Sequence, residues 1–129
     1  MENLGHPEHD QLTYAIIGAA YEVRKTKGVG MLESAYQGFL CRELSLRALD
    51  VVSQPKLPST YKGFTVNAAY RPDIIVNQTV IVEVKAVVAL IPVHTAQVLT
   101  YLSESGLKTG LLLNFNAMPF SDGIRRISL

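Results

Sequence analysis

Two carboxylates and a lysine stand in an otherwise apolar stretch of the sequence, between residues 70 and 85. Asp73 follows Pro72, and after nine intervening residues Glu83 and Lys85 are separated by a single valine. Apolar strands normally exclude charge, because burying an unpaired ion costs several kcal/mol. The three charges are therefore expected either to pair with one another at a sheet edge or to be collected to bind something.

The hairpin that we predict over this stretch decides which of these side chains share a face. Side chains alternate along a strand, so Glu83 and Lys85 share one face, and the neighbouring valines take the core-facing one. A three-residue connection over 77–79 sets Asp73 opposite Glu83, whereas a two-residue connection would turn Asp73 to the wrong face. A shared site therefore predicts a connection of odd length.

Two facing carboxylates need a positive partner. At about 4 Å and an effective dielectric of about 20 their repulsion is about 4 kcal/mol, and Lys85 offsets only part of it. Hard oxygen ligands with open positions for water and phosphate suit Mg²⁺, with Mn²⁺ as the alternative. In this interpretation Asp73, Glu83 and the carbonyl of Val84 hold a metal that stabilises charge on a scissile phosphate. Lys85 would orient the attacking water or help to deprotonate it, and the spacing is also that of metal-dependent nuclease sites.

The same residues have a simpler explanation. Acidic and basic residues commonly alternate on the solvated face of a sheet, so Asp73 or Glu83 paired with Lys85 on an exposed strand would need no ligand. The helices that flank the hairpin bear on the choice between the two explanations.

A helix is expected from Pro92 to about residue 104, ending at Gly106. It places Gln97 and Tyr101 four residues apart on one face, with His94 on the same stripe. A glutamine and a tyrosine could hold a phosphate or a base edge, although a polar helix flank with a half-buried tyrosine would also account for them. His94 is expected to cap or pack.

Glu33 lies in the first turn of an earlier helix, after Gly28 and Gly30. Its simplest role is to compensate the helix dipole. The two glycines are weak evidence for a phosphate-binding loop, since no lysine follows them. Histidine and cysteine do not recur at zinc spacing, and Cys41, the only cysteine, excludes an intramolecular disulfide and is expected to be a small buried hydrophobe.

Composition favours one domain over residues 1–129 with one sizeable core, because 48% of the residues are hydrophobic. The net charge of +1 lacks the strongly basic footprint of tight non-specific duplex binders. We expect no membrane span, since no apolar run approaches the ~20 residues required. The polar N-terminus and single cysteine favour a cytoplasmic protein.

The expected elements give an α+β fold with helices packed on a mixed sheet, in the order ααββββαββ. Asp10 is the expected N-cap of the first helix. The predicted helices cover 12–25, 32–49 and 92–104. The predicted strands cover 51–58, 64–69, 70–76, 80–86, 111–116 and 124–128, the first of them an edge or irregular strand.

Gly30, Glu33 and Tyr36 fall at the spacing G-x-x-E-x-x-Y. Together with the segments below, this pattern resembles the GxxExxY proteins, a bacterial and archaeal family related to the PD-(D/E)xK nucleases. The resemblance spans nearly the whole chain. The sequence departs from the family pattern at Arg24, where many relatives have histidine. The further matching segments are 17–23, 70–73, 83–86, 92–94, 96–97, 99–102 and 114–116.

The resemblance implies a restriction-endonuclease-like core, an α/β sandwich. It implies that Asp73, Glu83, Lys85 and the helix glutamate Glu33 surround one or two magnesium ions. Gln97 and Tyr101 match the Q-x-x-x-Y motif that contacts nucleic acid beside the metal site in the RecB-like branch.

Three functions remain open at this point. The first is a Mg²⁺-dependent nuclease hydrolysing DNA or RNA, and the second is a non-catalytic nucleic-acid-binding or assembly module of the same fold. The third is a homo-oligomer whose edge strands pair, with the charges forming salt bridges. The first is the interpretation that the motif residues favour.

Overall fold

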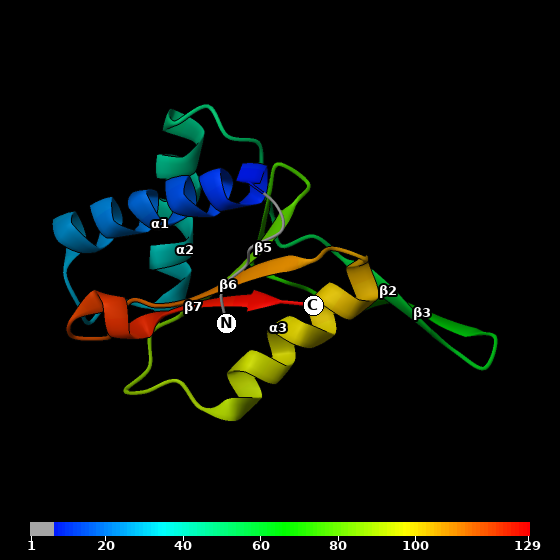
Figure 1. The fold of residues 1–129 in the computed structure, drawn as a ribbon. Helices are drawn as coiled ribbons and strands as arrows, with labels where there is room; N and C mark the ends of the chain where they lie inside the picture. The colour runs from blue at the N-terminus through cyan, green and yellow to red at the C-terminus, as the bar shows by residue number, and fades with distance from the viewer. Residues whose placement is uncertain (1–6) are drawn as a thin grey trace.

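The computed structural model describes residues 7–129, with side chains described from residue 11 onward. The elements, in chain order, are α1 (Pro7–Lys27), α2 (Glu33–Leu46), β1 (Val51–Ser53), β2 (Leu57–Tyr61), β3 (Phe64–Tyr70), β4 (Ile74–Val76), β5 (Val80–Lys85), α3 (Pro92–Ser105), β6 (Thr109–Asn114), a short 3₁₀ helix η1 (Phe120–Gly123) and β7 (Ile124–Ser128). A central sheet separates two helical layers: α1 and α2 cover one face and α3 covers the other (Figure 1).

The central sheet has the strand order β1-β4-β5-β6-β7. In the described part of the chain β5 and β6 pair in parallel, and the other neighbours pair antiparallel. Parallel neighbours need a crossover, which α3 supplies between β5 and β6. β5 therefore lies at the centre of the sheet, and its carboxyl end faces the start of α3.

Each face of the sheet has its own apolar core. Val82 and Val84 of β5 pack with α1 and α2. Ile81 of the same strand packs with Leu102 of α3 on the opposite face. Because side chains alternate along a strand, Glu83 belongs to the α3 side. On the other face Cys41 is half-buried against the first core, where burial raises the pKa of its thiol.

β2 and β3 form a separate two-stranded sheet that projects from the body of the molecule (Figure 1). We call this hairpin, Leu57–Tyr70, the arm. At its base the ring of Tyr70 meets the edge of Tyr101 on α3, with centroids 6.2 Å apart. At its far end Tyr61 pairs with Phe64 across a two-residue turn.

The α+β class and the helices flanking a mixed sheet are confirmed. The strand expected over 51–58 is wrong, because a break at Gln54, with φ 51°, divides it into β1 and the start of β2. Five strands therefore lie between α2 and α3, where four were expected. Asp10 is not an N-cap, since α1 begins at Pro7.

The strand expected over 70–76 is also shorter than its sequence suggests. Tyr70 ends β3, and β4 covers only Ile74–Val76. Arg71 and Pro72 form an irregular link, in keeping with the missing N–H of proline, which cannot donate to a sheet ladder. None of the helices in residues 7–129 combines the length and the apolar character that a membrane crossing requires.

Candidate metal centre

The connection between β4 and β5 has the odd length that a shared site requires. Val76 pairs with Val80 across the three residues 77–79, and the register continues to Ile74 opposite Val82. Asn77 holds this turn to the preceding strand, because its backbone N–H donates to the carbonyl of Asp50 and its Oδ1 accepts from the N–H of Asp50, both at 2.8 Å. The next position along this register sets Asp73 beside Glu83.

Two hydrogen bonds join Asp73 to the segment formed by Glu83 and Val84. The N–H of Asp73 donates to Oε1 of Glu83 at 2.9 Å. The N–H of Val84 donates to Oδ2 of Asp73 at 2.8 Å. Each carboxylate is thus fixed through one oxygen by the backbone of the opposing strand, so the register of the hairpin also orients both acids.

Two further groups, one after β1 and one on α2, hold the backbone of Asp73. Its carbonyl accepts from the backbone N–H of Gln54 at 2.7 Å and from Nε2 of Gln37 at 3.1 Å. Gln37 lies one helical turn after Glu33, and that spacing is the signal by which it could have been found. We did not predict this contact from the sequence, because the bond joins residues 36 positions apart.

The exposed-strand explanation for these charges fails. Glu83 is only 3% exposed, since α3 covers its face of the sheet. Nζ of Lys85 lies 3.7 Å from Oε2 of Glu83, and the lysine side chain is only 15% exposed. Two carboxylates and one ammonium therefore share a largely dehydrated space, and the negative charge is in excess.

This environment shifts the acids toward their protonated forms. Burial is the largest cause that raises the pKa of Glu83 to about 7, and the neighbouring charge of Asp73 adds to it. Burial also raises the pKa of Asp73, against the opposing hydrogen bond from Val84, and the charge of Glu33 adds to the rise. Lys85 opposes both shifts without cancelling them. A pair of this kind gains from any additional cation nearby.

α3 contributes a polar chain that ends on Lys85. Nζ of Lys85 donates to Oε1 of Gln97 at 3.2 Å. Tyr101, one turn further on, has its pKa raised to about 12, by burial first and then by the charges of Glu83 and Asp73, while a hydrogen bond from Gln97 opposes the rise. The structure therefore brings Gln97 and Tyr101 to the carboxylates.

His94 lies apart from this chain. Nδ1 of His94 accepts from the N–H of Ile91 at 3.1 Å, which confirms its capping role. Val98 of the same helix is fully buried and packs in the core on the α3 side of the sheet.

Glu33 reaches the same region from the start of α2. Its Oε2 accepts from the N–H of Ala86, directly after Lys85, at 3.3 Å, and its side chain is exposed. The glycines before it do not offer a phosphate-binding loop. The N–H of Gly28 donates to Arg24 at 2.8 Å, and that of Gly30 donates to Asn116 at 3.0 Å.

Asn114, at the end of β6, shapes the segment that follows Lys85. It is 1% exposed, and its side chain accepts from the N–H of Val87 at 3.0 Å and donates to the carbonyl of Val87 at 2.9 Å. The paired register of β5 and β6 places it beside Lys85. Asn114 belongs to the segment 114–116, which matches the family pattern, but only the parallel pairing of β5 and β6 reveals that it lies beside Lys85.

The donor set fits a divalent cation that retains water. Within the described residues, no group of three or more histidine, cysteine, aspartate or glutamate side chains is arranged to hold a metal ion by itself. Mg²⁺ is commonly bound by one or two carboxylates with water completing the shell, which is what Asp73 and Glu83 offer. Since the N–H and C=O of a strand residue point to the same side, the carbonyl of Val84 faces the edge where its N–H meets Asp73.

A sequence model of the PD-(D/E)XK nuclease superfamily matches residues 10–127. The match supports a nuclease-type function with a nucleic-acid substrate, and nucleases of this superfamily typically use divalent metals. No curated protein and no solved structure matches the chain. The chain belongs to the PD-(D/E)XK nuclease superfamily.

Proposed function

We propose that this protein is a Mg²⁺-dependent nuclease that hydrolyses phosphodiester bonds in DNA or RNA. The observation that carries the proposal is the buried Glu83 beside the half-buried Asp73, with both carboxylates fixed by backbone N–H groups next to Lys85. Burying two acids with a single ammonium raises the pKa of both, which a purely structural ion pair would avoid.

The residues that would hold the ion are Asp73, Glu83 and the carbonyl of Val84. When bound, Mg²⁺, or Mn²⁺ in its place, supplies positive charge for the scissile phosphate and makes water more acidic. Glu33 adds a fourth oxygen donor group at the rim, where its charge already acts on Asp73.

Lys85 is the proposed partner of the attacking water. Its ammonium is held between Oε2 of Glu83 and Oε1 of Gln97, so it points along the site with little freedom. Gln97 keeps its amide N–H groups for Tyr101 or for a phosphate, and the raised pKa of Tyr101 keeps that hydroxyl protonated as a donor at neutral pH. These two residues are proposed to position Lys85 as well as to contact the substrate.

Cleavage assays test the proposal. Wild-type protein with Mg²⁺ or Mn²⁺ is incubated with single-stranded, duplex and branched DNA and with single-stranded RNA. We expect metal-dependent cleavage of at least one substrate and its loss in Asp73→Ala. Glu22→Gln, which removes an exposed carboxylate from α1, serves as the control and should cleave like wild type. Absence of cleavage with every substrate and both metals would contradict the proposal.

A second candidate is a nucleic-acid-binding or assembly module without turnover. The net charge of +1 favours it, because a free-standing nuclease usually needs a basic groove. Calorimetry with Mg²⁺ addresses both candidates, since protein that binds no metal can serve neither as the nuclease nor as a metal-dependent module.

A further inference from the structure

The arm presents an apolar face to solvent. Tyr61 and Phe64 are cross-strand partners near its tip, and each is 70% exposed. Val66, two residues along β3 on the same face, is 48% exposed. A two-stranded hairpin by itself is only marginally stable in water, and contiguous exposed apolar side chains mark binding surfaces. The tip of the arm is therefore expected to have a partner.

The exposed face leads back to the carboxylates. Phe64 and Val66 alternate onto one side of β3, and beyond a register irregularity between Val66 and Tyr70 the strand ends at Tyr70, opposite Leu57. Tyr70 contacts Tyr101, and Tyr101 is close enough to Glu83 and Asp73 for their charges to raise its pKa. Six strand residues span about 20 Å, so the tip lies roughly that far from the base of the arm. The arm could hold a chain-like ligand whose other end reaches the site.

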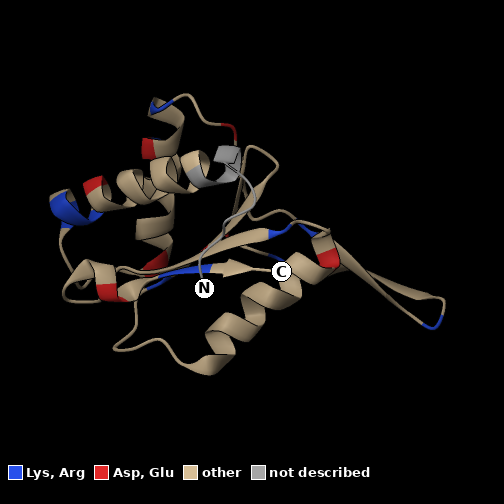
Figure 2. Ribbon diagram, viewed as in Figure 1, with Lys and Arg blue, Asp and Glu red and all other residues tan. Residues whose placement is uncertain are grey.

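The charge of the arm and its flanks identifies the class of ligand. Residues 51–72 include three of the twelve basic residues, Lys56, Lys62 and Arg71, and none of the eleven acidic ones. The rest of the chain then has nine basic and eleven acidic residues, so the small net positive charge comes from this segment. Figure 2 shows a basic residue at the tip and no acidic residue along the projecting strands.

The acidic residue that meets the base of the arm is Glu104 of α3. Its Oε1 accepts from Oγ of Ser59 at 2.9 Å. A segment of one sign favours a polyanion over a second copy of the chain, whose arm would bring the same charge.

We propose that the arm binds single-stranded nucleic acid, with unpaired bases stacked on Tyr61 and Phe64 and phosphates contacted by Lys62 and Arg71. Stacking on aromatic side chains beside a positive track is how proteins hold single strands without reading sequence. Arg71 directly precedes Pro72 and Asp73, so a strand lying along the arm is led to the carboxylates. The inference rests on the proposed function only in taking nucleic acid as the substrate. It adds that the substrate has unpaired bases.

Binding without catalysis tests the inference. Fluorescence anisotropy with a 5′-labelled oligothymidylate of about 20 nucleotides, in EDTA, gives the affinity of wild type and of the double variant Tyr61→Ala/Phe64→Ala. We expect wild type to bind the single strand more tightly than a blunt duplex of the same length. The double variant should bind the single strand at least about tenfold more weakly. Tyr14→Ala, which removes a 78% exposed tyrosine from α1, is the matched control and should bind like wild type.

A charge variant gives an independent readout. The logarithm of the affinity falls as the logarithm of the salt concentration rises. Lys62→Ala should make this slope less negative by about 0.7, the value for one phosphate contact on a single strand. Equal affinity of wild type and the double variant, or no binding of the single strand by wild type, would overturn the inference. If the double variant had a lower apparent mass in solution than wild type but the same oligonucleotide affinity, the face would be assigned to a second copy of the chain instead.

The outcomes separate this inference from the proposed function. Arm-dependent binding without cleavage would support the arm and leave the nuclease proposal unsupported. Cleavage with the same KM in wild type and the double variant would support the nuclease and refute the arm.

Discussion

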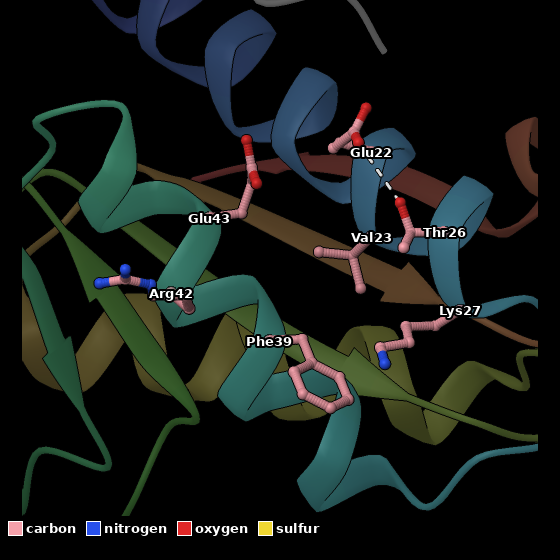
Figure 3. A pocket seen from close by; sticks show the side chains of 7 residues that line it. All are labelled: Glu22, Val23, Thr26, Lys27, Phe39, Arg42 and Glu43. Carbon is pink, nitrogen blue, oxygen red and sulfur yellow. Dashed lines mark hydrogen bonds between the residues drawn. The ribbon is translucent and has the colours of Figure 1, made fainter.

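Two regions of the molecule combine carboxylates with basic groups, and they differ in burial. Near the end of β5, the buried Glu83 lies beneath α3 beside the partly buried Asp73 and Lys85. Between α1 and α2 a groove of about 250 Å³ is lined by acidic, basic and apolar side chains, among them Glu22, Lys27 and Glu43 (Figure 3). The residue types are similar, so the comparison isolates what burial adds.

In the groove Glu22, Lys27 and Glu43 each have a local partner near water. Oγ1 of Thr26 donates to Glu22 at 3.3 Å, and Nζ of Lys27 lies 4.7 Å from the ring centre of Phe39 (Figure 3). Glu43 pairs with Arg47 one turn along α2 at 2.9 Å, and that arginine side chain is 37% exposed. Exposed pairs of this kind contribute little, typically below about 1 kcal/mol. Reactivity is therefore expected only at the buried cluster.

Replacing one lysine in each region should give the largest contrast. Lys85→Ala removes the ammonium held between Glu83 and Gln97, and we expect cleavage to fall by roughly 10²–10⁴-fold. Lys27→Ala removes an exposed ammonium and should leave the rate within about twofold, in line with the small effects of exposed surface changes. The measurement is kcat on the substrate that wild type cleaves best, and equal losses in both variants would break the comparison.

The pH dependence of stability gives the next contrast. The pKa of Glu83 rises from 4.5 to about 7 on folding, so between these pH values the folded protein keeps a proton that the unfolded chain releases. Stability is then highest below pH 4.5 for this group and falls as pH rises to about 7. The fall should be roughly 3 kcal/mol in metal-free protein.

Urea titrations across this pH range measure the free energy of unfolding of wild type and of Glu83→Gln. The amide oxygen of this variant can still accept a hydrogen bond from the N–H of Asp73. That variant should lose the fall, whereas Glu43→Gln, in the groove, should retain it. Identical pH profiles of stability for wild type and Glu83→Gln would show that burial does not raise the pKa of Glu83.

Metal binding should offset the loss of stability caused by ionising the buried Glu83 carboxyl. At pH 8, above the pKa of about 7 of Glu83, the Glu83 carboxyl is ionised and can bind a cation. Mg²⁺ at 100 times its Kd should raise the free energy of unfolding by about 2.7 kcal/mol in wild type and in Glu43→Gln. Asp73→Asn should show little of this gain. Thermal unfolding with and without Mg²⁺ measures it, and a gain that Asp73→Asn retains would place the ion elsewhere.

Much of this site followed from local rules. Alternation along β5 and the three residues 77–79 were enough to place Asp73 beside Glu83, and the helical spacing of Gln97 and Tyr101 placed them on one stripe. These predictions depend on the geometry of single elements, which the chain specifies over a few residues.

The remainder depends on contacts that no local rule contains. Gln37 reaches Asp73 from a distant helix, and Asn114 reaches Val87 only because β5 and β6 run parallel. The division of the 51–58 segment was missed, because Pro55 predicted an irregular strand and not a change of sheet. The arm could be recognised as a surface only when its pairing showed that Tyr61 and Phe64 face solvent together.

The most direct test of the metal centre is a crystal soaked in Mn²⁺ at pH 8, with the anomalous signal mapped over the whole molecule. The account predicts one strong peak bounded by the carboxylates of Asp73 and Glu83 and the carbonyl of Val84. A map with no peak there, or with manganese bound only in the groove between α1 and α2, would contradict it.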